Sequence, residues 1–328
     1  MEERTNVLKP MTVSEILDDT FRVYGKNLWT VLIYSAVIGG IFSLIVSFIT
    51  GQMMVPVDTF FKDWMNILEN PNIDPETAFG PIMEMMPRFF ALQGMVTLLS
   101  LIGLIFVNPF IQGGIINVTY SYITGRSMSI NESLISTLKK FWKLILTSLS
   151  LIPYFIGVGI AFVILTVISI IPLVLSGISM SKDPTGGRIV GFIFLIFVAV
   201  ALMIILAVLA GMFITFTFHV ATTEESYGFN AIGRSFKLVA KKFWRVLGIS
   251  LLINLIVGII AGIIALVSGI TSLVTPFAAI SNYMTGFITS AFITPIIHIS
   301  TTLLFMDTKA RVEPRVHDGY YEQIQNQG

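Results

Sequence analysis

Polar side chains that could bond to one another or to a small ligand lie inside long apolar runs of this chain. The candidates are Asn108, Gln112 and Asn117 in the run 91–121, His219 in the run 189–220, Asn254 in the run 246–272, and His298 in the run 283–306. An amide or imidazole in apolar surroundings needs a hydrogen-bond partner, because burying an unpaired polar group is unfavourable. These six residues are therefore candidates for an intramembrane polar site.

Two prolines give the second and sixth runs a shared pattern. The segment Asn108–Gln112 resembles the segment Thr294–His298, with proline second and an amide or imidazole fifth. Proline weakens the helical ladder and frees a carbonyl one turn back. Two interpretations stay open: a kink whose polar residue bonds to a neighbouring helix, or a small polar site between the second, fourth and sixth helices. For His298 the corresponding choice is between a neutral, hydrogen-bonded histidine and a proton relay.

Residues for catalysis are missing from the sequence. The chain has no cysteine, which excludes disulfides, thiolate metal sites and thiol catalysis. The apolar runs contain no Asp or Glu, and no His-Glu-x-x-His zinc motif or Walker phosphate loop occurs. We therefore expect no enzymatic activity, no cofactor and no metal site. We also expect no nucleic-acid partner, because the basic residues do not gather on a soluble face.

The elements that must position the polar residues are transmembrane helices. Hydrophobic residues make up 55% of the 328 residues and charged residues only 12%, which is unusual for a soluble chain. About 20 apolar residues cross the hydrocarbon of a bilayer as a helix. Charge-free apolar runs of that length or more fall near 28–50, 91–121, 144–178, 189–220, 246–272 and 283–306. We predict an all-α polytopic protein, with one membrane domain over residues 1–328 and six transmembrane helices.

The distribution of Lys and Arg predicts the orientation. Six crossings place both ends of the chain on one side, and sixteen Lys and Arg residues fall on that side. The other side has only Lys62, Arg88, Lys182 and Arg188. Because basic loops are retained in the cytoplasm during insertion, both termini are predicted to be cytoplasmic.

A basic–aromatic motif is repeated along the chain. The sequence Lys139–Trp142 returns as Lys241–Trp244 at an offset of 102 residues, and Gly25–Trp29 is a weaker copy. We predict three repeated units, each an amphipathic interfacial helix followed by a transmembrane hairpin. The interfacial helices are predicted at 12–27, 131–143 and 230–245, and a capping box at Thr12–Glu15 begins the first. We interpret the basic clusters as topological anchors, and binding to anionic lipid is compatible with them.

Two segments outside the crossings are predicted to be exposed to water. Residues 51–90 form an acidic, amphipathic extracytoplasmic loop, interpreted as a cap on the outer leaflet or as a lid or partner-docking surface. Residues 307–328 form a cytoplasmic tail. In the fifth run, Gly258 and Gly262 place small residues four apart, a spacing suited to close helix approach.

Three patches resemble a known family. Met11–Tyr24 looks like the opening, Ala231–Gly248 like the central signature, and Thr301–Arg311 like the C-terminal end of the bacterial membrane-domain family named for glycerophosphoryl diester phosphodiesterases. The resemblance implies a bacterial plasma-membrane protein with this architecture. Some family members carry a phosphodiesterase domain after the membrane domain. This chain lacks the His, Glu and Asp cluster of such a hydrolase, so the resemblance implies a stand-alone membrane domain without that activity.

These observations predict a non-enzymatic membrane subunit that binds protein or lipid partners in transport or envelope maintenance. The alternative is a small transporter or lipid-handling permease, with its polar site at the kinked even-numbered helices. A permease requires an accessible cavity lined by the polar residues, whereas a scaffold requires a tightly packed centre.

Overall fold

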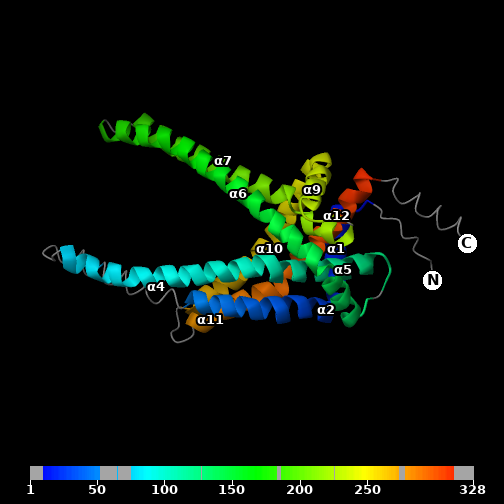
Figure 1. The fold of residues 1–328 in the computed structure, drawn as a ribbon. Helices are drawn as coiled ribbons and strands as arrows, with labels where there is room; N and C mark the ends of the chain where they lie inside the picture. Colours follow the sequence, from blue (N-terminus) through cyan, green and yellow to red (C-terminus); the bar gives the residue numbers. More distant parts are fainter. Residues whose placement is uncertain are drawn as a thin grey trace, which may run out of the picture.

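The computed structural model describes residues 10–51, 65, 75–126, 128–182, 186–224, 226–272 and 278–313, and its regular structure there is helical (Figure 1). Six helices are long and apolar enough to cross a membrane, and we call them spans one to six. They are Leu28–Gly51, Phe89–Ile123, Ile130–Pro172, Ile189–Thr223, Phe243–Thr271 and Tyr283–Val312. The prediction of an all-α protein with six such helices is confirmed. The chain is a multi-pass membrane protein.

The helices form long arms that meet at one end of the molecule. Helices α6 (Ile130–Lys182) and α7 (Gly186–Phe213) form a hairpin that projects away from α4 (Pro75–Ile102), α2 (Leu28–Leu32) and α11 (Ala278–Ile288) (Figure 1). Five further helices lie where the arms converge. We call this region the head, and it comprises α1 (Val13–Lys26), α5 (Asn108–Ile123), α8 (Thr217–Thr223), α9 (Phe229–Lys241) and α12 (Thr294–Val312).

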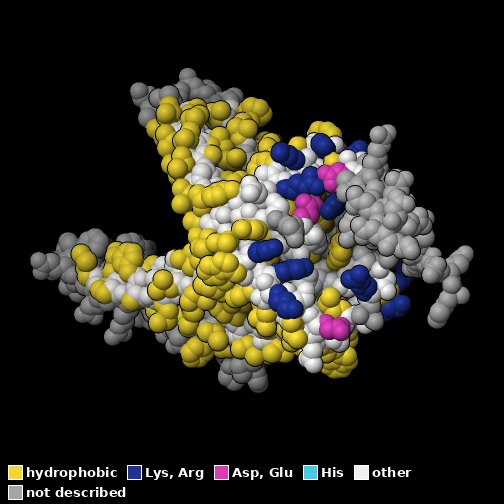
Figure 2. All heavy atoms as spheres, turned by 45° about the vertical axis from the view of Figure 1, so that its right-hand side comes forward, with side chains coloured by type: hydrophobic (Ala, Val, Ile, Leu, Met, Phe, Trp, Pro, Cys, Tyr) yellow, Lys and Arg dark blue, Asp and Glu magenta, His cyan; other side chains and the backbone are white. Residues whose placement is uncertain are grey.

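Burial is concentrated in the head. Its fully buried apolar side chains come from all five of its helices, and examples are Ile16, Ile115, Val220, Leu238 and Leu303. By contrast, no residue is buried in the most apolar part of span three or span four. The arms are covered with apolar side chains, and Lys and Arg side chains gather on the head (Figure 2). This arrangement suits arms solvated by lipid and a head in contact with water.

Helix α1 begins with the predicted capping box. The Thr12 hydroxyl accepts from the Glu15 N–H at 3.2 Å, and the Glu15 carboxylate accepts from the Thr12 N–H at 2.5 Å. These hydrogen bonds hold the pKa of Glu15 below its usual value. One face of α1 buries Ile16, Thr20 and Val23. The helix ends at Asn27, whose side-chain amide donates to the Val23 carbonyl at 3.0 Å, and α2 begins at the next residue.

The second predicted interfacial helix is not a separate helix. Residues 131–143 are the first turns of α6, which continues without interruption to Lys182. A capping box at Ser129 and Glu132 precedes this helix, but no Gly or Pro interrupts it before Pro153. The third, predicted at 230–245, is shorter than expected: α9 ends at Lys241, and α10 (Phe243–Ser272) begins after Lys242, whose φ of −134° is not helical.

The boundaries of the two predicted water-exposed segments also differ. Helix α4 begins at Pro75 and runs into span two, so residues 75–90 are helical and not loop; residues 52–64 and 66–74 lie outside the described residues. Proline is tolerated in the first turn of a helix because its missing N–H would be unpaired there. The tail predicted from residue 307 begins later, because α12 continues to Val312 and Asp307 is fully buried. Residues 314–328 lie outside the described part of the chain.

Candidate functional site

A cavity of about 370 Å³ lies between spans one, two and six, near the middle of spans one and two. Its apolar lining includes Phe42, Val107 and Ile111. Six polar side chains line the rest: Ser43, Asn108, Thr289, Ser290, Thr294 and His298. The structure therefore brings Asn108 and His298, two of the six predicted polar residues, to one cavity. Its third wall is span one and not span four.

All three walls of the cavity contain π-helical turns. These are η1 (Ile33–Gly40), η2 (Gly103–Val107) and η3 (Thr289–Ile293), and η2 and η3 end directly before the two predicted proline motifs. The Asn108 N–H bonds to the Gly103 carbonyl and the Thr294 N–H to the Thr289 carbonyl, five residues back in each case. Proline cannot donate to the ladder, and a wider turn before it accommodates the break. Turns of this kind occur frequently at functional sites.

Small residues bring spans one and six together beside the cavity. A Cβ atom on Gly39 would lie 2.7 Å from the Ser290 hydroxyl, and one on Gly40 would lie 2.6 Å from the Phe287 ring. The Ser35 hydroxyl donates to the Ala291 carbonyl across the same contact at 2.8 Å. Such packing stabilises helix pairs in lipid, where apolar surface alone gives no preference for another helix.

His219 lies behind the cavity and not in it. Its ring is buried against Phe305, with centroids 5.6 Å apart, and against Phe216 at 6.1 Å. Neither ring nitrogen of His219 has a hydrogen-bond partner among the described residues. The contacts of the ring are those of an aromatic core residue.

Asn117 belongs to a hydrogen-bonded cluster in the head. Its amide nitrogen donates to the Thr137 hydroxyl at 3.2 Å, and its oxygen accepts from the Lys140 ammonium at 3.2 Å. The Tyr34 hydroxyl lies 3.0 Å from the Ser133 hydroxyl and 3.1 Å from that of Thr137. Lys140 also donates to a carbonyl of α8 at 2.8 Å. The cluster joins η1, α5, α6 and α8, which gives Asn117 the structural role that was one of the two interpretations.

The last two predicted residues stand apart. Asn254 is exposed on α10, and its amide donates to the Ser250 carbonyl of the same helix at 2.7 Å. Gln112 is half-buried on α5, one residue after Ile111, and does not line the cavity.

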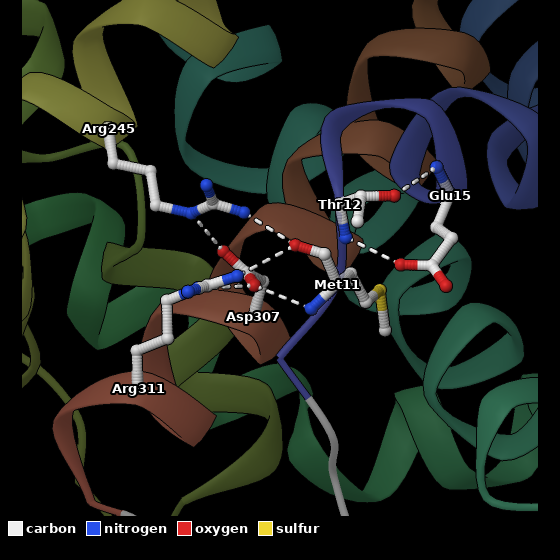
Figure 3. A network of polar contacts seen from close by, with 6 residues as sticks. All are labelled: Met11, Thr12, Glu15, Arg245, Asp307 and Arg311. Carbon is white, nitrogen blue, oxygen red and sulfur yellow. Dashed lines mark hydrogen bonds and ion pairs between the residues drawn. The ribbon is translucent and has the colours of Figure 1, made fainter.

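A buried carboxylate ties the two ends of the described chain together (Figure 3). Asp307 is fully buried and accepts from Arg245 Nε at 2.7 Å, from Arg311 Nε at 2.8 Å, and from the Met11 N–H at 2.7 Å. The Met11 carbonyl in turn accepts from both guanidinium groups, at 2.5 Å from Arg245 and 2.9 Å from Arg311. We call these four residues the Asp307 clamp. It fixes the start of α1 to α10 and α12.

The sequence prediction missed the Asp307 clamp because the sixth crossing was ended at Met306. Asp307 and Arg311 are four residues apart, a spacing that places them on one face of a helix. That spacing signals that the helix continues past residue 306. The partnership with Arg245, 62 residues earlier, has no local signal in the sequence.

A second ionic cluster lies on the same end of the head. Arg234 on α9 makes two contacts of 2.7 Å with Glu313 and one of 3.1 Å with Glu224, and Lys309 contacts Glu224 at 2.8 Å. The hydrogen bond from Arg234 holds the pKa of Glu313 below its ordinary value of 4.5. The same contact, followed by that with Glu224, raises the pKa of Arg234 despite partial burial. Arg234 is therefore positively charged throughout the accessible pH range.

Three tryptophans of the repeated motif point outward. Trp29, Trp142 and Trp244 are 75%, 67% and 80% exposed, although their neighbours Thr30 and Val246 are buried. Exposed Lys and Arg side chains lie on the head near the base of the arms (Figure 2). Trp at the ends of spans together with Lys and Arg is the pattern of a membrane–water interface.

The cavity presents hydroxyl, amide and imidazole groups that can form hydrogen bonds. In the described part of the chain, no group of three or more His, Asp or Glu residues could hold a metal ion. Comparison with family models, with curated proteins and with solved structures finds no match for this chain.

Proposed function

We propose that this chain is a non-enzymatic subunit of a bacterial plasma-membrane assembly, which binds protein or lipid partners in transport or envelope maintenance. One observation carries the proposal: the α6–α7 hairpin buries no residue along the most apolar parts of its two spans. Its contacts within the described chain are mainly between its own two helices and with the head. Long apolar faces are thus available to other molecules in the bilayer.

Small residues on exposed faces of the hairpin and of α10 favour a helical protein partner. A Cβ atom on Gly157, Gly191, Gly258 or Gly262 would meet no atom of the described chain within 4 Å. Glycines at packed positions such as Gly39 contact another span closely. Because small residues let helix backbones approach in lipid, the pair Gly258 and Gly262 on α10 presents a face suited to a partner helix.

We also propose that the chain belongs to the membrane-domain family that it resembles. Each of the three resembling patches supplies part of the Asp307 clamp: Met11, then Arg245, then Asp307 with Arg311. The three-unit repeat belongs to the same proposal, and two of its units begin with capping boxes, at Thr12 and at Ser129. The basic residues of the head support a cytoplasmic location for both termini within this proposal.

Photocrosslinking in native membranes tests the partner. A benzophenone amino acid at Leu266, 69% exposed and four residues from Gly262, is expected to give a discrete protein adduct. The double substitution Gly258→Leu and Gly262→Leu should remove that adduct without unfolding the chain, because both positions are open. Ile263→Leu on the same helix is the matched control and should leave the adduct unchanged. Adducts to lipid alone, or an adduct that survives the double substitution, would contradict a helical protein partner at this face of α10.

The cavity favours a second candidate, a small transporter or lipid-handling permease. Asn108 and His298 line it, as such a protein requires. In proteoliposomes, Asn108→Ala and His298→Ala should each abolish transport under this candidate, whereas Gln112→Ala, outside the cavity, should not. Equal transport by all three variants would exclude it.

A further inference from the structure

We infer that the cavity between spans one, two and six binds a small uncharged molecule that carries hydroxyl or amide groups. The inference concerns ligand binding at mid-membrane depth and does not depend on the partner proposed above. The inference rests on three observations: the chemistry of the lining residues, the lining side chains that make no hydrogen bond to another described residue, and the π-helical turns beside the cavity.

The lining excludes charged ligands. No Lys, Arg, Asp or Glu contributes to it. A charged group near the middle of a bilayer is unfavourable without a partner of opposite charge. A phosphate or carboxylate would find no guanidinium or ammonium here, and a cation would find no carboxylate. The ligand must therefore be neutral.

The free polar groups select a ligand that both donates and accepts hydrogen bonds. The side chains of Ser43, Asn108, Thr289 and His298 make no hydrogen bond to another described residue. Together they offer amide donors and acceptors, two hydroxyls and an imidazole. Ser290 and Thr294 donate to carbonyls at 3.4 and 3.3 Å, which leaves the oxygens of both hydroxyls able to accept. A purely apolar molecule would leave these groups unsatisfied.

The size and surroundings of the cavity point to a small ligand with one apolar side. About 370 Å³ lies near the lower end of the range of small-molecule sites. Phe42, Val107 and Ile111 add an apolar part to the lining. The three π-helical turns lie in spans one, two and six beside the same cavity, and turns of this kind occur frequently at functional sites.

Cysteine labelling can test this inference without background, because the chain has no cysteine of its own. Ser43→Cys places a thiol in the cavity, Lys242→Cys places one on the water-exposed head, and Val163→Cys places one on the exposed face of α6. The probes are four methanethiosulfonates bearing hydroxyethyl, propyl, sulfonatoethyl or trimethylammonioethyl groups. Rates at Ser43→Cys are divided by those of the same reagent at Lys242→Cys.

After this normalisation, the hydroxyethyl reagent should label Ser43→Cys at least about fivefold faster than the propyl reagent. One ordinary hydrogen bond to the reagent is enough to give a factor of that size. Both charged reagents should be slower still, and Val163→Cys should show no preference for hydroxyethyl. Asn108→Leu combined with Ser43→Cys should remove the preference. Ser290→Cys, on the opposite wall, repeats the measurement if Ser43→Cys does not fold. Equal labelling by the two neutral reagents, faster labelling by a charged one, or no labelling of either cavity thiol would overturn the inference.

Discussion

The head and the α6–α7 hairpin are both helical, yet different interactions hold them. The head buries side chains from five helices and joins them through the Asp307 clamp, the Arg234 cluster and the Asn117 cluster. In the hairpin, the Tyr154 hydroxyl donates to the Ala210 carbonyl at 2.7 Å, and the Thr166 hydroxyl contacts the Met203 sulfur at 3.8 Å. Polar clusters hold the head, whereas lipid can solvate the apolar surface of the hairpin as well as another helix does.

The largest effect is expected at the Asp307 clamp. Asp307→Ala leaves two guanidinium groups and the Met11 N–H without their acceptor, and breaking a buried ion pair in this way costs about 3–5 kcal/mol. The free energy of unfolding in detergent, from chemical denaturation, measures the loss. Asp19→Ala is the matched control, because its pair with Arg22 is partly exposed, and it should cost less than about 1 kcal/mol. Equal losses for the two variants would show that the clamp does not hold the head.

A packed glycine should be the next most sensitive position. A Cβ on Gly114 would collide with the ring of Tyr34, which is fully buried and hydrogen-bonded to Ser133 and Thr137. Overpacking of this kind typically costs about 1–3 kcal/mol, so Gly114→Ala should lower the thermal midpoint in detergent. An unchanged midpoint would mean that this contact is loose.

The Arg234 cluster should add a smaller, pH-dependent contribution. Because the folded-state pKa of Glu313 lies below its ordinary value, its stabilisation is present above about pH 4.5 and is lost as the pH falls through the folded pKa. The pair is partly exposed, with 28% of the Arg234 side chain and 20% of the Glu313 side chain accessible, so the effect should be about 1 kcal/mol. The slope of thermal stability against pH between neutral and acid should be shallower in Glu313→Gln than in the parent chain. Identical slopes would contradict the assignment.

The smallest effect is expected in the hairpin. Gly191 on α7 meets no atom within 4 Å of a hypothetical Cβ, so Gly191→Ala should leave stability within about 0.5 kcal/mol of the parent value. Gly114→Ala, measured in the same assay, is the matched comparison for Gly191→Ala. A loss at Gly191 as large as that at Gly114 would show that the hairpin packs against another part of the molecule.

The positions of the spans could be predicted because charge-free length is a direct requirement of the bilayer. The break before Pro109 and Pro295 was also predictable, since it follows from the missing proline N–H. The π-helical form of that break, and the position of Gly39 beside Ser290, depend on how spans one and six pack. Residues 131–143 continue into the rest of α6 because no Gly or Pro ends the helix there. Their resemblance to the segments that form α1 and α9 favoured a separate helix in the sequence prediction.

The residues that line the cavity could also be predicted only in part. Asn108 and His298 could be recognised as polar residues inside spans, but their neighbours Ser43 and Ser290 are common residues of apolar helices and carry no signal by type. The Asp307 clamp joins residues 62 and 296 positions apart, and no local pattern predicts contacts at such separations.

Side-specific labelling of single cysteines in intact cells and in inverted membrane vesicles tests the membrane architecture most directly. Met65→Cys lies between spans one and two, and Arg126→Cys between spans two and three. An impermeant maleimide is expected to label Met65→Cys only from outside the cell and Arg126→Cys only from the cytoplasmic face. Labelling of both thiols from the same face would contradict the six-span account.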